Sequence, residues 1–320
     1  MKISFIKCQG SGNDFILVDE TIYRYNFSEE QRSEISKALC RRSGKIGADG
    51  ILFYIKDHHA DARMRIFNPD GSEASMCGNG IRCIARHARD ITKKESMYIA
   101  ANTSLYETHH QPDLFPGVHS YSVKIHTVSF NKNEVPVKWN KDILVDELIP
   151  ELSDRFRFTA VSMGNPHIVA MTNEENMEEL IRIGKIANTN IILFPEGVNV
   201  SFCRVKEPHS LVVTTYERGV GITKSCGTAM SASAIVSCKL RLYPFGEFID
   251  VYNNGGMVRC RPFVDDAGKY EVILFGNATF EYEAEVEIDF SKPNEFSFKM
   301  VKEYGEEKEI YYRSVKGTRF

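Results

Sequence analysis

Two short stretches, one in each half of the chain, share the same layout. SMCGNG at 75–80 and KSCGTA at 224–229 each place a cysteine directly before a glycine, and residues with helical periodicity follow both. The segments that lead to them, NPDGSEASMC and ERGVGITKSC, begin with a polar residue nine positions before the cysteine and carry glycines between. We therefore predict an internal duplication in which each half contains strands, a Cys-Gly step and a helix.

Hydrophobic periodicity and turn residues predict the elements around these two steps. Ser28 and Gln31 form a capping-box pattern at the start of a helix predicted over 29–42. Further helices are predicted at 80–91, near 176–187 and at 227–240, and strands at 2–8, 15–19, 51–55, 62–67, 121–127, 156–161, 197–205 and 210–216, with several more up to about 288. GSGND at 10–14 is interpreted as a turn. The tail after residue 288 is charged, and no element is predicted there.

The segment ETHHQPDLFPGVH at 107–119 interrupts the strand patterns with two prolines, a glycine and three histidines. Three histidines suggest a metal site, but no second group of ligands lies nearby in the sequence. We therefore interpret the segment as a solvated loop and expect a domain boundary close to it.

Composition limits the class of protein and its partners. The chain has 320 residues, 42% of them hydrophobic and 26% charged, which is typical of a soluble globular protein with room for two domains. The net charge of -3 gives no electrostatic reason to expect nucleic acid. We find no signal peptide and no run of about 18 apolar residues, so a cytoplasmic protein without a membrane partner is expected. The eight cysteines form no CxxC pair, which argues against a zinc ribbon.

A cysteine at a helix N-terminus has a chemical meaning beyond packing. The unsatisfied backbone N–H groups and the positive end of the helix dipole favour thiolate over thiol, so such a cysteine acts as a base or nucleophile. The same N–H groups hold a carboxylate well. Two such steps facing each other across a cleft suit the inversion of a stereocentre, in which one sulfur removes an α-proton and the other delivers a proton to the opposite face. Preorganised donors, each worth about 3 kcal/mol, would stabilise the carbanion.

Six stretches of the chain together resemble the diaminopimelate epimerase family, the cofactor-independent two-cysteine enzymes of lysine and cell-wall biosynthesis. They are GSGNDF (10–15), GADGIL (47–52), RIFNPDGSEASMCGNGIR (65–82), MGNPH (163–167), GVNVSF (197–202) and TYERGVGITKSCGTA (215–229). The resemblance implies an α+β fold of two pseudo-symmetric domains, each a curved, mostly antiparallel sheet around a central helix, with the active-site cleft between them. It also implies the absence of any cofactor or metal.

The resemblance assigns roles residue by residue. Cys77 and Cys226 correspond to the catalytic pair. Backbone N–H groups of Gly78, Asn79, Gly227 and Thr228 would bind the α-carboxylate, His167 and Glu217 would hold the α-amino group, and Asn13, Asn68, Asn165, Asn199 and Arg218 would line the rest of the pocket. The guanidinium of Arg218 suits the distal carboxylate of a diacid. The six remaining cysteines are assigned to packing.

The same resemblance sets the expected organisation of the chain. An N-terminal domain over 1–120, completed by a strand near 278–288, is followed by a C-terminal domain over 121–277 and a charged extension over 289–320. The expected partner is a small-molecule substrate, diaminopimelate, and a homodimer is expected from the family alone. We also expect oxidation to link Cys77 to Cys226 and to inactivate the enzyme.

This sequence departs from the family pattern at a few positions. Gly50 stands where many relatives carry a glutamine, and Ile222 interrupts the common Gly-Glu-Thr run. The usual GTG after the second cysteine is Gly227-Thr228-Ala229. These changes remove no catalytic group, so they bear on specificity more than on chemistry.

Three other functions stay open at the level of sequence. One is a racemase of another amino acid, such as histidine, on the same scaffold. Another is a cysteine hydrolase that uses Cys77 with His167, which leaves Cys226 without a role. The last is a non-catalytic protein that binds an amino acid or a partner in the cleft.

Overall fold

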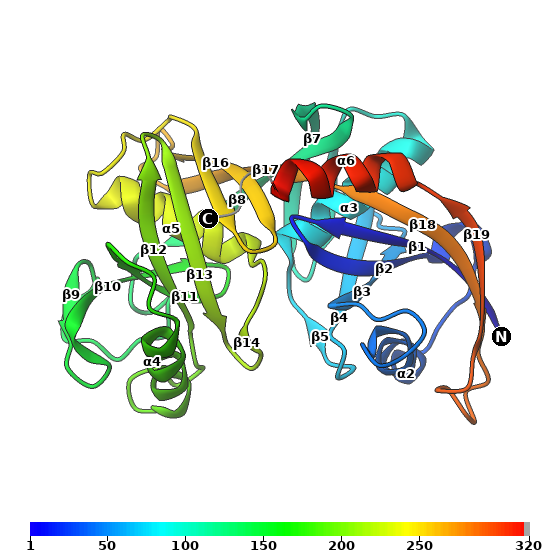
Figure 1. Ribbon diagram of the computed structural model, residues 1–320, viewed down its shortest axis with the longest axis horizontal. Helices are drawn as coiled ribbons and strands as arrows, with labels where there is room; N and C mark the ends of the chain where they lie inside the picture. The colour runs from blue at the N-terminus through cyan, green and yellow to red at the C-terminus, as the bar shows by residue number, and fades with distance from the viewer. Residues whose placement is uncertain (317–320) are drawn as a thin grey trace. The chain divides into compact units, whose positions relative to one another are not determined.

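The structure, a computed structural model, describes residues 1–316, and these divide into two compact units (Figure 1). Unit 1 comprises residues 1–123 and the residues from 275 onward, and unit 2 comprises residues 124–274. Each unit has an α+β fold in which helices pack on both faces of a largely antiparallel sheet. Within residues 1–316, no helix combines the length and the apolar character that a membrane span requires.

Unit 1 is built on one continuous sheet. Its elements are β1 (Lys2–Gly10), β2 (Asn13–Asp19), α1 (Glu20–Tyr23), α2 (Glu29–Cys40), β3 (Gly50–Ile55), β4 (Ala62–Phe67), β5 (Glu73–Ala74), α3 (Gly78–Thr92), β6 (Ser96–Ala101), β7 (Ser104–Phe115), the first part of β8 (Val118–Ser129), β18 (Thr279–Glu287), β19 (Ser297–Glu303) and α6 (Gly305–Lys316). The strand order is β19-β18-β1-β2-β3-β4-β6-β7-β8, and only β2–β3 and β4–β6 are parallel.

The sheet of unit 1 carries a core on each face because its strands alternate apolar residues. Phe15 and Leu17 of β2 pack in the cluster that surrounds α3, whereas Ile16 and Val18 pack in the cluster that contains Ile35 of α2. Strand side chains point to opposite faces at every second residue, so one apolar run serves both clusters. Helix α3, which follows the first Cys-Gly step, is therefore buried within the unit along most of its length.

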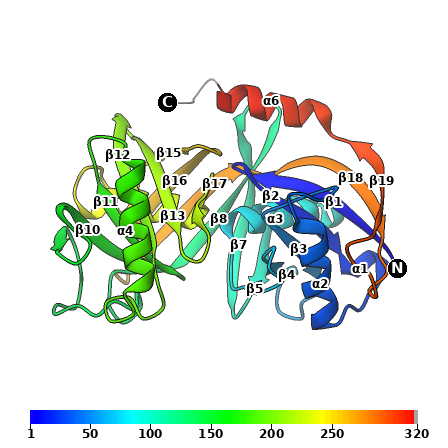
Figure 2. The ribbon, with the colours of Figure 1, turned by 60° about the horizontal axis from the view of Figure 1, so that its bottom comes forward.

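Unit 2 repeats this plan. Its elements are the end of β8, β9 (Glu147–Ile149), β10 (Ser153–Met163), β11 (Pro166–Met171), α4 (Met177–Thr189), β12 (Asn199–Glu207), β13 (Ser210–Glu217), β14 (Gly221–Ile222), α5 (Gly227–Lys239), β15 (Ile249–Asn253), β16 (Gly256–Val264) and most of β17 (Tyr270–Asn277). Here β11–β12 and β13–β15 are parallel, as β2–β3 and β4–β6 are in unit 1. Figure 2 shows α4 lying along the β11–β13 face. The predicted duplication is confirmed by this repeated order of strands and helices.

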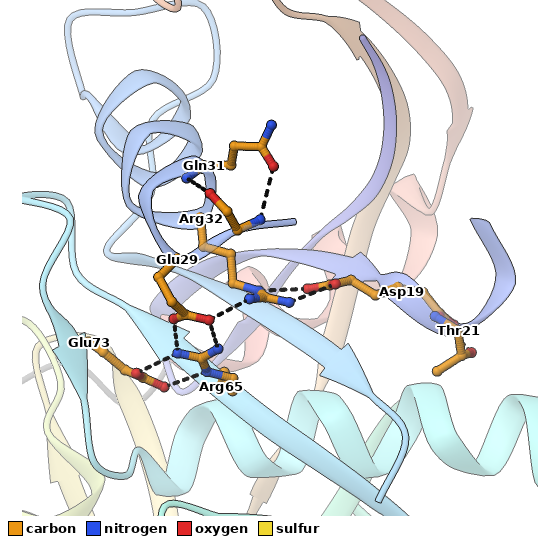
Figure 3. Close-up of polar contacts among 9 residues, drawn as sticks. Asp19, Thr21, Glu29, Gln31, Arg32, Arg65 and Glu73 are labelled. Atoms are coloured by element: carbon orange, nitrogen blue, oxygen red, sulfur yellow. Dashed lines mark hydrogen bonds and ion pairs between the residues drawn. The ribbon is translucent and has the colours of Figure 1, made fainter. Parts of the chain in front are cut away.

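A cluster of charged side chains ties helix α2 to the segment that leads to the first cysteine. Arg65 on β4 forms ion pairs with both Glu29 and Glu73, and Arg32 on α2 binds Glu29 and Glu20 (Figure 3). Forked guanidinium–carboxylate contacts of this kind fix geometry as well as contributing energy. Because β5 ends three residues before Cys77, the cluster restrains the approach to the N-terminus of α3.

Two parts of the chain differ from the sequence-based expectation. Residues 107–119 do not form a solvated loop, because β7 and β8 run through them as a hairpin that turns at 116–117. The hairpin accommodates Pro112 at an irregularity in the β7–β8 register between Gln111 and Phe115. His109 bonds Ser96 and Glu107, and no group of three or more potential ligands in residues 1–316 is arranged to hold a metal.

The charged tail after residue 288 also has regular structure over its described part. Strand β19 pairs with β18, and α6 is held to the unit by the ion pair between Glu307 and Arg86 of α3, 2.7 Å apart. Tyr311 of α6 is fully buried. Residues 317–320 of the expected extension lie outside the described residues.

Helix α4 packs closely against the end of β13, and a substitution in α4 tests whether this packing stabilises unit 2. A Cβ added to Gly184 of α4 would lie 2.3 Å from the ring of Tyr216. We expect Gly184→Ala to destabilise unit 2, because overpacking costs about 2 kcal/mol and outweighs the helix-propensity gain of about 1 kcal/mol. Urea unfolding followed by the fluorescence of Trp139, the only tryptophan, measures the change. Lys185→Ala, at the exposed neighbouring position, is the control, and equal stability of the two variants would contradict the packing argument.

Candidate active site

Both cysteines of the repeated Cys-Gly steps occupy the N-cap position of a helix. Cys77 precedes α3 with φ -147° and ψ 113°, and Cys226 precedes α5 with φ -129° and ψ 106°. The carbonyl of each accepts the first helical hydrogen bond, from Ile81 at 2.9 Å and from Met230 at 3.0 Å. Each sulfur therefore lies beside the N–H groups of a first helical turn, where an anion is favoured.

In unit 1 the side chain of Asn13 lies against the first cysteine. Asn13 follows the β1–β2 turn, in which Ser11 and Gly12 both have positive φ, of 55° and 81°. Its amide oxygen is 3.6 Å from the Cys77 sulfur and 3.3 Å from Nδ2 of Asn79. Its amide nitrogen donates to a carboxylate oxygen of Asp49 at 2.7 Å. Asn13, Cys77 and Asn79 thus lie together in unit 1.

The buried guanidinium of Arg82 joins this turn to the start of α3. Arg82 is fully buried and donates to Ser11 Oγ at 3.0 Å and to the carbonyl of Asn277 at 3.1 Å. A Cβ on Gly276 would lie 2.7 Å from the guanidinium carbon, so only glycine leaves room there. The sequence places Arg82 at the end of a family motif but does not reveal this role. The one sequence signal for this buried role is that Arg82, a charged residue, lies close to the apolar stripe of its helix.

Asn68 is held in the turn between β4 and β5. Its backbone N–H donates to the carbonyl of Ser72 at 2.8 Å, and its Nδ2 donates to Ser72 Oγ at 3.0 Å. Gly71, with φ of 84°, closes the turn against α2, where a Cβ would lie 2.3 Å from Ser33 Oγ. The structure therefore places Asn68 at the end of β4 that leads to Cys77.

In unit 2 a chain of polar contacts runs from the second cysteine into the β10–β11 turn. The sulfur of Cys226 is 3.4 Å from the hydroxyl of Thr228, and that hydroxyl accepts from Asn165 Nδ2 at 3.4 Å. Asn165 Oδ1 is in turn 2.9 Å from His167 Nε2. Asn165 therefore corresponds in position to Asn13 of unit 1. Each contacts the residue two positions after the cysteine, which is Thr228 in unit 2 and Asn79 in unit 1.

The environment of the second cysteine favours its thiol form. Burial raises the pKa of Cys226 well above its ordinary value, and the negative charge of Glu217 raises it further. The Thr228 hydroxyl and the Ala229 backbone N–H act in the opposite direction without reversing the shift. The helix N-terminus alone does not make this sulfur a resting thiolate, because desolvation of the charged form outweighs it.

His167 is buried and neutral. Burial, together with the positive charge of Arg218, lowers its pKa from 6.5 to about 3. Its Nε2 is within hydrogen-bond distance of Asn165, and its buried Nδ1 has no hydrogen-bond partner among the described residues. A neutral imidazole with an unpaired ring nitrogen accepts a hydrogen bond, so the side chain is suited to meet a donor such as an ammonium group.

The remaining predicted residues of unit 2 gather at the ends of β12 and β13. Asn199 Oδ1 accepts from the backbone N–H of Arg218 at 2.9 Å, and the Arg218 guanidinium donates to the carbonyl of Glu196 at 2.7 Å. Glu217 accepts a short hydrogen bond from the hydroxyl of Thr223. Gly197 lies against the Arg218 side chain, where a Cβ would be 2.9 Å from its Cδ. Asn165, His167, Asn199, Glu217 and Arg218 thus belong to one connected region.

The structure accounts for one departure from the family pattern and locates another. At Gly50 an added Cβ would lie 2.9 Å from the carbonyl oxygen of Phe67, so a glutamine requires a shift of β4. Ile222 lies on β14 opposite Tyr216 and is 36% exposed, which leaves its side chain outside the core.

The family model and the similar sequences identify one family. The family model described as diaminopimelate epimerase matches residues 5–104 and 159–280. A diaminopimelate epimerase from Clostridium acetobutylicum is 45% identical over 93% of this chain and 89% of its own length, and one from Enterococcus faecalis is 40% identical over 88% of each. The crystal structure of a PhzF-family phenazine biosynthesis protein from Bacillus anthracis covers 90% of this chain and 100% of its own, with a TM-score of 0.67 and 16% identity, which shows the fold alone.

The neutral state of His167 makes unit 2 sensitive to acid. The unfolded chain binds a proton at this histidine below pH 6.5, whereas the folded chain does not until about pH 3. The contribution of His167 to the free energy of unfolding is therefore complete above pH 6.5 and is lost as the pH falls. The loss is about 1.5 kcal/mol between pH 6.5 and 5. Urea unfolding of the wild type and His167→Gln at these two pH values, read by Trp139 fluorescence, measures the loss. We expect it to be smaller in the variant by that amount; the same pH dependence in both proteins would rule out a neutral His167.

Proposed function

The chain belongs to the diaminopimelate epimerase family, and on this premise we propose that it interconverts LL- and meso-diaminopimelate by proton transfer between Cys77 and Cys226. It is an isomerase of the racemase and epimerase class. One observation carries the mechanistic part of the proposal. The two cysteines hold the same N-cap position in two units that repeat the same plan.

In the proposed reaction one sulfur acts as a base and the other as an acid, on opposite faces of the α-carbon. One sulfur, as thiolate, removes the α-hydrogen, and the other, as thiol, delivers its proton to the opposite face of the carbon. The first sulfur ends as thiol and the second as thiolate, so the reverse reaction uses the same groups with exchanged roles. The raised pKa of Cys226 supports a thiol in unit 2, and the proton donor for one direction is thus present at neutral pH.

The carbanion formed in this reaction requires stabilisation without an electron sink. We assign the α-carboxylate to backbone N–H groups in the first turns of α3 and α5, which are Gly78, Asn79, Gly227 and Thr228. The dipoles of both helices then act on the charge that develops beside the α-carbon. The favourable electrostatic contribution of these donors is large because they are fixed by the fold before the substrate arrives.

The polar groups of unit 2 match the rest of a diamino diacid. The unpaired Nδ1 of His167 and the carboxylate of Glu217 suit the α-ammonium group. The guanidinium of Arg218 suits the distal carboxylate, and the amides of Asn13, Asn68, Asn165 and Asn199 provide the remaining hydrogen bonds. A racemase of a substrate without a distal carboxylate is the second candidate on this scaffold, and it leaves Arg218 without its partner.

A cysteine hydrolase and a simple binding protein fit the site less well. A hydrolase needs a histidine that takes a proton near neutral pH, whereas the pKa of His167 is about 3. A protein that only binds its ligand would not need a cysteine at both helix N-termini. We further propose that the enzyme works in the cytoplasm as a homodimer, in lysine and peptidoglycan precursor biosynthesis.

Single cysteine replacements test the two-base proposal. We expect Cys77→Ala and Cys226→Ala each to reduce inversion of LL-diaminopimelate at least about a hundredfold, because general acid and base catalysis each contribute at least that much. Chiral chromatography of the product measures the rate. Cys83→Ala and Cys238→Ala, which alter buried cysteines farther along α3 and α5, are matched controls and should retain activity. Near-normal inversion by either Cys77→Ala or Cys226→Ala would contradict the two-base proposal.

A further inference from the structure

We propose that Asp49 is a positioning residue for Cys77, because its carboxylate decides which end of the Asn13 amide faces the sulfur. The inference rests on the proposed function only for the importance of Cys77. The contacts themselves lie entirely within unit 1. Asp49 precedes β3 and belongs to the stretch GADGIL, in which the sequence alone indicates no chemical role for it.

The orientation of the Asn13 side chain follows from the chemistry of its partners. Asp49 Oδ2 lies 2.7 Å from Nδ2 of Asn13 and 3.1 Å from the backbone nitrogen of Asp14. An ionised carboxylate only accepts hydrogen bonds, so the amide nitrogen, and not the amide oxygen, must face Asp49. The amide oxygen is then left on the side of Cys77 and Asn79.

Asp49 is itself held in place by a group of charges. Arg42 donates to Asp49 Oδ1 at 2.5 Å and to both carboxylate oxygens of Asp14. Lys7 binds Asp14 from the other side, at 2.5 Å. Although burial opposes it, the hydrogen bond from Arg42 and the charge of Lys7 lower the pKa of Asp14 to about 2. The turn at Asn13 thus contacts a charged cluster in which Arg42 binds Asp49, and Arg42 and Lys7 bind Asp14.

The orientation has a direct consequence for the acidity of the cysteine. A carbonyl oxygen accepts a hydrogen bond from the thiol of Cys77 but is repelled by its thiolate, so the observed orientation favours the thiol. The opposite orientation would point an N–H donor at the sulfur and favour the thiolate. Asp49 therefore restrains the acidity of Cys77 through Asn13 without touching the sulfur.

The influence of nearby charges on the pKa of Cys77 must be distinguished from the effect of the Asn13 orientation. Asp49 contacts Asn13 directly, Arg42 binds Asp49 and Asp14, and Lys7 binds Asp14. Arg82 contacts the carbonyl of Gly78 in the first turn of α3. Removing Asp49 also removes one negative charge, which by itself lowers the pKa of a nearby thiol. A test therefore needs a control that removes a charge of the same sign and leaves the amide contact intact. Asp14→Asn is that control.

The test measures the acidity of Cys77 by its rate of alkylation. Full-length protein is treated with iodoacetamide from pH 6 to 10, and peptide mass mapping gives the rate at each cysteine, which follows its thiolate fraction. Four proteins form a double-mutant cycle: wild type, Asp49→Asn, Asn13→Ala and the double variant. Cys83, which is fully buried, reports unfolding, because it reacts only when α3 opens.

We expect Asp49→Asn to alkylate Cys77 about tenfold faster at pH 7 than wild type, which corresponds to a fall of about one unit in its pKa. In the Asn13→Ala background the same replacement should change the rate less than about twofold, since Asp49 acts through Asn13. Asp14→Asn should stay within about twofold of wild type. Asp49→Ala replaces Asp49→Asn if the latter exposes Cys83.

Three outcomes would overturn the proposal. An equal effect of Asp49→Asn with and without Asn13, an equal effect of Asp14→Asn, or an unchanged rate in Asp49→Asn would each show that Asp49 does not orient the amide. The readout uses no substrate, so it stands apart from the epimerase activity. Loss of that proposed activity would leave the rate comparison intact, and a failed comparison would leave the two-base proposal standing.

Discussion

The arrangement of the candidate site depends on a helix in each unit whose body is enclosed by its own sheet and whose N-terminus begins at a cysteine. In α5 every residue from Gly227 to Cys238 is buried, and α3 is buried from Gly78 to Ala88. A helix packed in this way cannot slide or turn without breaking its core, so the first-turn N–H groups and the N-cap sulfur are held rigidly. Their unsatisfied donors make each N-terminus a site for negative charge.

The two units differ in which end of an asparagine amide faces the N-terminus of the buried helix. In unit 1 the amide of Asn13 is oriented by Asp49 and offers its oxygen to Cys77. In unit 2 the amide of Asn165 lies between His167 and Thr228, with its oxygen 2.9 Å from His167 Nε2 and its nitrogen 3.4 Å from the Thr228 hydroxyl. The duplicated units thus differ in the residue that contacts this asparagine, which is Asp49 in unit 1 and His167 in unit 2. The two sulfurs therefore have different neighbours, an amide oxygen beside Cys77 and a hydroxyl beside Cys226.

Much of this structure could be predicted from the sequence, because the signals are local. The periodicity of Ile81 and Ile84 predicts a helix at 80–91, which the structure shows as α3, and the capping box at Ser28 is present as predicted. Residues 107–119 were mispredicted because prolines and histidines mask a strand whose irregular register absorbs Pro112. The contacts of Arg82 with Asn277 and of Asn13 with Asp49 join distant parts of the chain, and no periodicity encodes them. The low pKa of His167 likewise depends on burial that only the fold creates.

The central claim is that two separate groups handle the two protons, and isotope incorporation tests it most directly. Reduced protein is incubated with LL-diaminopimelate in D2O without added cofactor, and early samples are analysed by mass spectrometry after chiral separation. The account predicts meso product that carries one deuterium at the inverted carbon, while unreacted LL substrate keeps its hydrogen. Meso product that retains the original hydrogen, or deuterium entering the LL substrate as fast as the product, would contradict the two-base mechanism.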